Sequence, residues 1–179
     1  MKKTSLYLTA VIALQVLWMM ATAITMETKL TGPNTVLLET MPVDPRDFLR
    51  GDYVILNYKI SSIPAAWIQR TPQQNLQNQT VYVTLEKRGK FHEATAASLT
   101  PHPPAPGQYI ARGTIENSWN FRGQASVRVN YGIERYYVKE GTGNPRGTLT
   151  VQCVANPDET LLIKQVFVNG KPYAQAMRE

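Results

Sequence analysis

The sequence predicts a mainly β domain, either a sandwich or a partly open barrel, preceded by one N-terminal transmembrane helix. An uncharged, apolar stretch runs from Thr4 to Met26. After it, short segments of strand-type residues recur with turn signals between them, and no long amphipathic helical pattern competes. The chain has 179 residues, 43% of them hydrophobic, which suffices for one packed domain and an anchor. We expect residues 1–26 to form the anchor and residues 27–179 an extracytoplasmic β domain.

The N-terminal stretch is long enough to span a hydrocarbon core, which takes about 20 helical residues. Lys2 and Lys3 precede it, and the positive-inside rule keeps them on the cytoplasmic side. Two interpretations stay open. Residues 21–23 (Ala-Thr-Ala) fit a cleaved signal peptide, whereas an apolar stretch longer than about 7–15 residues favours an uncleaved anchor. We therefore expect a single-pass membrane protein, in contact with lipid through this helix, with its C-terminal domain outside the cytoplasm.

The elements of the exported part follow from alternation and from turn residues. Strands are expected at residues 35–40, 53–60, 81–87, 91–97, 108–117, 125–131, 135–139, 148–155 and 161–168. The third and fourth form a hairpin around residues 88–90, and Asn169-Gly170 is a tight turn that leads into a short edge segment at 171–173. A short helix is expected near residues 63–70. Irregular segments are expected at 71–80, 101–107 and 141–147.

Two of these strands carry specific expectations about burial. In the 53–60 strand, Val54, Leu56 and Tyr58 share one face, and the opposite face is also partly apolar, which predicts burial on both sides. In the 148–155 strand, Cys153 alternates with apolar residues and reads as a small core residue. As the single cysteine of the chain, Cys153 excludes an intramolecular disulfide.

Composition argues against several function classes. The net charge of +6 is spread along the chain rather than gathered into a stripe, so no nucleic-acid partner is expected. His92 and His102 are the only histidines, and neither has neighbours with metal-ligand or Ser/His/Asp spacing. We expect no catalytic residue of a standard type, no metal and no cofactor.

Two segments, residues 43–59 and 131–143, concentrate the charged, aromatic and glycine residues that form the candidate site. The candidates are Asp44, Arg46, Asp47, Arg50, Gly51, Asp52, Tyr53, Leu56, Tyr58, Tyr131, Gly132, Glu134, Tyr136, Tyr137, Glu140, Gly141 and Gly143.

Several roles remain open for these residues. The first segment forms a polar turn network that fixes strand register, a surface for a protein partner, or a divalent-cation site built on Asp44, Asp47 and Asp52. Glu134 and Glu140 are candidate partners for the arginines of the first segment. The glycine pair at 141 and 143 resembles a phosphate loop only weakly, because no strand–helix context follows it.

The spacing Gly51-Asp52-Tyr53-x-x-Leu56-x-Tyr58 resembles the signature of the bacterial GDYXXLXY family. The flanking residues 43–47, the 131–143 segment and the tail from Leu149 to Lys171 are similar to the rest of its pattern. The resemblance implies a membrane-anchored, extracytoplasmic protein, and it extends to domains that accompany polytopic membrane proteins. A polytopic membrane protein is therefore the expected partner.

A second, local resemblance concerns type I signal peptidases. Pro45, followed by Arg50-Gly51-Asp52-x-Val54, is similar to their Pro…Gly-Asp-x-Val segment, but Pro42 stands where their nucleophilic serine would be. This implies a shared β architecture without the activity. The expected function is a non-enzymatic domain that binds a membrane or envelope protein. The alternative is a hydrolase with a non-standard carboxylate site that includes Asp52 and Glu134.

Overall fold

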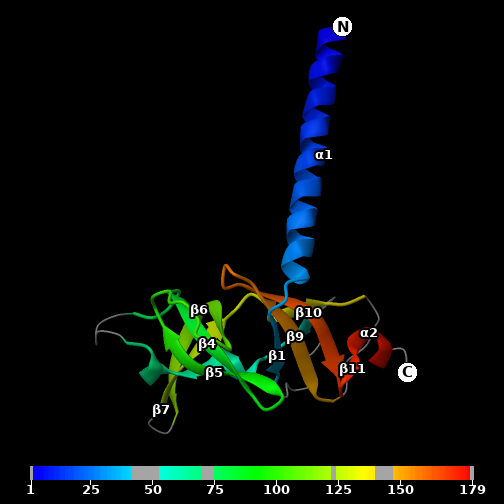
Figure 1. Cartoon of the computed structure of the whole chain (residues 1–179). Helices are drawn as coiled ribbons and strands as arrows, with labels where there is room; N and C mark the ends of the chain where they lie inside the picture. Colours follow the sequence, from blue (N-terminus) through cyan, green and yellow to red (C-terminus); the bar gives the residue numbers. More distant parts are fainter. Residues whose placement is uncertain (1, 42–52, 70–74, 122–123, 140–146, 178–179) are drawn as a thin grey trace.

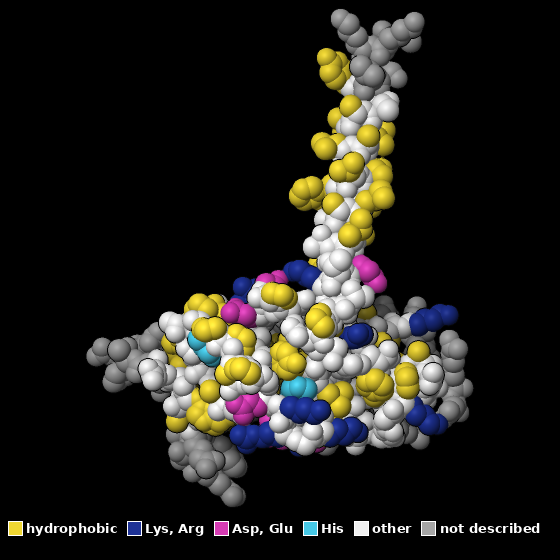
Figure 2. Space-filling model, in the orientation of Figure 1, with side chains coloured by type: hydrophobic (Ala, Val, Ile, Leu, Met, Phe, Trp, Pro, Cys, Tyr) yellow, Lys and Arg dark blue, Asp and Glu magenta, His cyan; other side chains and the backbone are white. Residues whose placement is uncertain are grey.

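The computed structural model describes residues 2–41, 53–69, 75–121, 124–139 and 147–177. Helix α1 (Lys2–Leu30) stands clear of the β domain (Figure 1). Its segment Tyr7–Leu30 is long and apolar enough to cross a membrane, by length and composition, and none of it is buried in the domain. Apolar side chains cover much of the surface of this helix, whereas Lys, Arg, Asp and Glu side chains lie scattered over the surface of the domain (Figure 2).

In the part of the chain that the structure describes, eleven strands form three antiparallel sheets, which confirms the mainly β class. The five-stranded sheet contains, in spatial order, β3 (Ser62–Pro64), β7 (Gln124–Asn130), β6 (Gln108–Phe121), β4 (Thr80–Arg88) and β5 (Phe91–Ser98). The four-stranded sheet contains β1 (Thr35–Glu39), β9 (Leu149–Ala155), β10 (Leu161–Val168) and β11 (Lys171–Pro172). The third sheet is a ribbon of β2 (Tyr53–Ile55) and β8 (Arg135–Tyr137).

The predicted local turns are confirmed. The β4–β5 hairpin turns at Gly89, whose φ of +62° suits a residue without a Cβ. The β10–β11 turn uses Asn169 and Gly170, both at positive φ, as a type I′ turn requires. Residues 101–107 contain no helix or strand, as expected of a proline-rich segment.

One prediction about elements is wrong. The 53–60 strand ends at Ile55: the ladder of β2 with β8 stops there, and further along the segment Tyr58 forms only an isolated bridge with Thr40. A 3-10 helix at Lys59–Ser61 follows. The short helix expected near 63–70 is a 3-10 helix at Ala65–Trp67, and it directly follows β3, which pairs with β7. The expected edge segment is confirmed as β11, which lies at the edge of the four-stranded sheet, and α2 (Tyr173–Ala176) follows it.

The burial of the 53–60 segment is also one-sided rather than two-sided. Val54, Leu56 and Tyr58 are fully buried, whereas Tyr53 and Ile55 are half-buried. The three buried side chains belong to a single core cluster to which all three sheets contribute. Cys153 lies in that cluster with no exposed surface, as predicted, and burial raises the pKa of its thiol far above the usual value.

The two larger sheets meet where β1 lies against β5, and a histidine links them. The Leu37 backbone N–H donates to Nδ1 of His92 at 3.1 Å. The His92 side chain is buried and stands edge-on to the Tyr109 ring, with ring centroids 5.7 Å apart. Since Nδ1 accepts a hydrogen bond, it carries no proton in this arrangement.

Acidification should therefore destabilise the domain through His92. Burial, and secondarily the charge of Lys87, lower the pKa of His92 in the folded state. The unfolded chain then takes up the proton first, so the stabilisation is complete above about pH 6.5 and is lost as the pH falls through that value. Urea unfolding should be measured at several pH values. The midpoint urea concentration of the wild type should fall as the pH is lowered, and that of His92→Asn should change less with pH. His102→Asn is the matched control, and equal slopes for wild type and His92→Asn would exclude His92 as the group.

Candidate functional site

The two candidate segments lie side by side in the ribbon. β2 and β8 pair antiparallel with Tyr53 opposite Tyr137, Val54 opposite Tyr136 and Ile55 opposite Arg135. Directly opposed residues of an antiparallel pair share a face, so the ribbon has an inner face, with Val54 and Tyr136, and an outer face. On the inner side the Tyr136 ring stacks edge-on against Tyr173, with centroids 5.5 Å apart.

Beyond the ribbon, two tyrosines tie the segments together reciprocally. The Tyr58 hydroxyl donates to the Ile133 carbonyl at 2.7 Å, and the Tyr131 hydroxyl donates to the Ile60 carbonyl at 2.8 Å. Both bonds are buried, and burial raises the pKa of both phenols far above the usual value, with the Glu134 charge acting in the same sense. The hydroxyls thus remain donors at any ordinary pH. We call this pair of bonds the tyrosine latch.

The turn between β7 and β8 positions the second half of the latch. Gly132 has a φ of +81° and its N–H donates to Oδ1 of Asn130 at 2.8 Å. The Tyr131 N–H donates to Oε1 of Glu134 at 2.6 Å, and the Leu56 N–H donates to the Glu134 carbonyl at 2.8 Å. Glu134 therefore closes the turn with its side chain and continues the pairing with its backbone.

The outer face of the ribbon consists of Tyr53, Ile55, Arg135 and Tyr137. The Tyr137 side chain is 70% exposed, and its ring centroid lies 5.9 Å from that of Tyr53. The Arg135 guanidinium lies over the Tyr53 ring, 5.2 Å from its centroid, within cation–π range. A surface group of two tyrosines and an arginine, with Arg135 and Tyr137 exposed and Tyr53 half-buried, has the composition of an interface hot spot.

The sequence match and the geometry coincide at this ribbon. Residues 14–155 match the family described as GDYXXLXY protein, which is well over half of the chain. The chain belongs to the GDYXXLXY family. No curated protein and no solved structure matches it.

Geometry explains the spacing of the GDYXXLXY signature in its described half. Leu56 and Tyr58 have the same parity as Val54 and point into the core, where neither is exposed. Tyr53 has the opposite parity and lies on the outer face. The signature therefore specifies one surface aromatic residue, one core aliphatic residue and the first tyrosine of the latch.

The other half of the GDYXXLXY signature and its flanks lie outside the described residues. They are Asp44, Arg46, Asp47, Arg50, Gly51, Asp52, Glu140, Gly141 and Gly143. The proposed cation site, the pairing of Glu134 with an arginine or with Asp52, and the signal-peptidase resemblance at 45–54 all depend on them and remain predictions. Among the residues that the structure describes, no cluster of three His, Cys, Asp or Glu side chains occurs that would hold a metal.

Sequence reasoning missed three polar residues. Arg135 on the outer face became apparent only from its register with β2. Arg128 supports the signature segment, since its Nη2 donates to Oδ1 of Asn57 at 2.6 Å. Lys29 at the end of α1 pairs with Asp158, 2.7 Å from Nζ to Oδ2.

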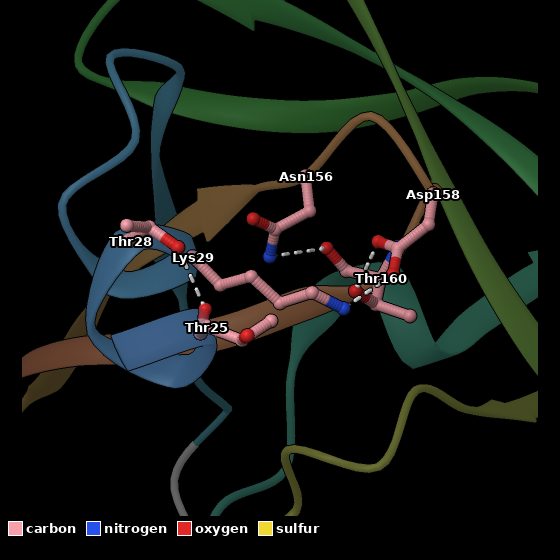
Figure 3. Close-up of polar contacts among 6 residues, drawn as sticks. All are labelled: Thr25, Thr28, Lys29, Asn156, Asp158 and Thr160. Atoms are coloured by element: carbon pink, nitrogen blue, oxygen red, sulfur yellow. Dashed lines mark hydrogen bonds and ion pairs between the residues drawn. The ribbon is translucent and has the colours of Figure 1, made fainter. Parts of the chain in front are cut away.

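The Lys29–Asp158 pair joins the helix to the β9–β10 turn (Figure 3). Asp158 also accepts from the Thr160 hydroxyl at 2.6 Å, and hydrogen bonds from Lys29 and Thr160 lower the pKa of Asp158 to about 2. Both side chains of the pair are more than one third exposed, so the pair contributes under about 1 kcal/mol. Just past the helix, the Ala155 N–H donates to the Asn34 carbonyl at 2.8 Å, which fixes the linker against β9.

Proposed function

We propose that this GDYXXLXY protein is a membrane-anchored, extracytoplasmic β domain that binds a membrane or envelope protein through the outer face of the ribbon. The observation that carries the proposal is the contact group of Tyr53, Arg135 and Tyr137, in which Arg135 and Tyr137 are exposed and Tyr53 is half-buried. Core side chains such as Val54 and Tyr58 are buried, whereas Arg135 and Tyr137 present their side chains to solvent. Tyrosine and arginine are the residues most enriched in interface hot spots, because they bury large areas at low entropic cost.

The proposed location is the bacterial inner membrane, in a single pass with the C-terminal domain outside the cytoplasm. Lys2 and Lys3 at the start of α1 support this orientation by the positive-inside rule. The short link from Leu30 to β1, pinned by Asn34 and the Lys29–Asp158 pair, supports a domain held close to the bilayer. A partner within the same membrane would then meet the domain at a high effective concentration.

The test uses the intact chain in its native membranes. A photoreactive amino acid in place of Tyr137 should yield an adduct with another membrane or envelope protein. Adding Arg135→Ala should reduce the adduct about tenfold, because truncating a hot-spot residue weakens binding by roughly 1–2 kcal/mol or more. The matched control places the same photoreactive residue at Trp119, an exposed aromatic on β6 that is 39% exposed. Equal adducts from both positions, or an adduct indifferent to Arg135→Ala, would contradict the proposal.

A further inference from the structure

The centre of helix α1 carries an uncompensated polar side chain, Gln15. Gln15 lies midway along the uncharged stretch, about 16 Å along the helix from both Thr4 and Met26. A hydrocarbon core about 30 Å thick that contains this stretch therefore has the Gln15 amide near its midplane. Polar groups at that depth are rare and need a hydrogen-bond partner.

Three threonines in the C-terminal half of the helix find partners on the helix itself. The hydroxyls of Thr22, Thr25 and Thr28 donate to the carbonyls of Met19, Ala21 and Thr25 at 2.7–2.8 Å. These bonds satisfy the hydroxyls inside a bilayer without help from another molecule.

Gln15 differs from the threonines because its amide has two N–H donors and a carbonyl acceptor. Within the described residues, no hydrogen bond reaches this amide. Its own domain cannot supply one, since Leu30 and the domain lie about 22 Å further along the helix (Figure 1). Another molecule in the bilayer can supply the partner that this amide lacks in the described residues.

We infer that the partner is the Gln15 of a second copy of this chain, so that two copies of α1 pair in parallel within the membrane. An amide is both donor and acceptor, so two amides related by a two-fold axis complement each other. All copies insert with the same orientation, which places both Gln15 side chains at the same depth. This inference rests on the membrane-spanning part of the proposed function and is independent of the ribbon.

The surroundings of Gln15 form a continuous seam for such a pair. Leu8, Val11, Gln15, Trp18 and Thr22 follow one another at alternating intervals of three and four residues, the repeat that lets two helices stay in contact with a left-handed crossing. All five are exposed in the isolated chain. Nothing in the described domain covers this face, since none of the spanning segment is buried.

The experiment measures energy transfer between donor- and acceptor-labelled full chains in lipid vesicles over a range of protein-to-lipid ratios. The wild type should associate, and Gln15→Leu should lower the association constant about 3- to 30-fold, the range seen for interhelical polar contacts in membranes. Thr22→Val is the matched control on the same seam. It removes a hydroxyl that is already satisfied, and its association should stay within about twofold of the wild type.

Oxidative cross-linking checks the orientation of the pair. A cysteine in place of Val11, on the seam, should form a disulfide between copies more readily than one in place of Ala13, which faces away. The native Cys153 is fully buried and does not interfere.

Protease protection of the vesicles shows whether the chain has inserted. An inserted chain that stays monomeric, or whose association is unchanged by Gln15→Leu, overturns the pairing and leaves the anchored-domain proposal standing. A mature chain that lacks residues 1–23 overturns both.

Discussion

Replacing Tyr58 by alanine should destabilise the domain by about 3–5 kcal/mol, the range for a fully buried aromatic residue. The ring has no exposed surface, so its loss leaves a cavity where the three sheets meet. Its hydroxyl is the donor to the Ile133 carbonyl, which loses its partner as well. Because small domains are stable by about 5–15 kcal/mol, a large part of the population should unfold at moderate urea concentrations. Urea unfolding followed by tryptophan fluorescence measures the change.

Tyr58→Phe and Tyr131→Phe separate the tyrosine latch from the packing of the rings. Each removes one hydroxyl, leaves a buried carbonyl unpaired and should destabilise by about 1–3 kcal/mol. The two bonds join the same pair of segments in opposite directions, so the double variant should be less destabilised than the sum of the two. If both single variants are as stable as the wild type, the latch contributes nothing to the free energy of unfolding and packing alone holds the two segments together.

The hairpins were predictable because the information for them is local. The β4–β5 and β10–β11 turns lie between strands adjacent in sequence, and Gly89 and Asn169-Gly170 specify their backbone angles directly. The 53–60 segment alternates as well as any strand, yet it divides between β8 and the bridge to Thr40. The alternation of apolar and polar residues predicts which side chains face the core, and it did so correctly for Val54, Leu56 and Tyr58. It does not predict which strand is the neighbour.

The same distinction applies to the candidate site. Recognition of the GDYXXLXY pattern drew attention to Tyr53, Tyr58, Tyr131 and Tyr137 because they stand in or beside its motifs. The separation of these tyrosines into a latch and an exposed face depends on the register of β2 against β8, which spans some 80 residues of chain. The contacts of Arg135 and of the Lys29–Asp158 pair also join segments that are far apart in the sequence, so no local spacing predicts them.

Gly113→Ala should be the other strongly destabilising change, by about 3 kcal/mol, because strand β6 has no room for a Cβ there. An added Cβ would overlap Cγ1 of Val129 and would stand 2.9 Å from the Asn130 carbonyl oxygen and 3.1 Å from the Tyr131 ring. The valine can be shortened, but the Asn130 carbonyl belongs to the backbone that pairs β7 with β6. The Tyr131 contact connects this position to the latch, so the alanine should also strain the Tyr131–Ile60 bond.

Two further variants test that explanation for Gly113. Combining Gly113→Ala with Val129→Ala removes the side-chain overlap and should recover only part of the lost stability, since the contact with the Asn130 carbonyl persists. Gly89→Ala is the control for the general effect of replacing a strand-end glycine: nothing lies within 4 Å of its added Cβ, and only its positive φ opposes the change, by about 1 kcal/mol. Urea unfolding of the four proteins measures the differences. Full recovery in the double variant would show that Val129 alone excludes a side chain at position 113 and that the backbone beside the latch can adjust.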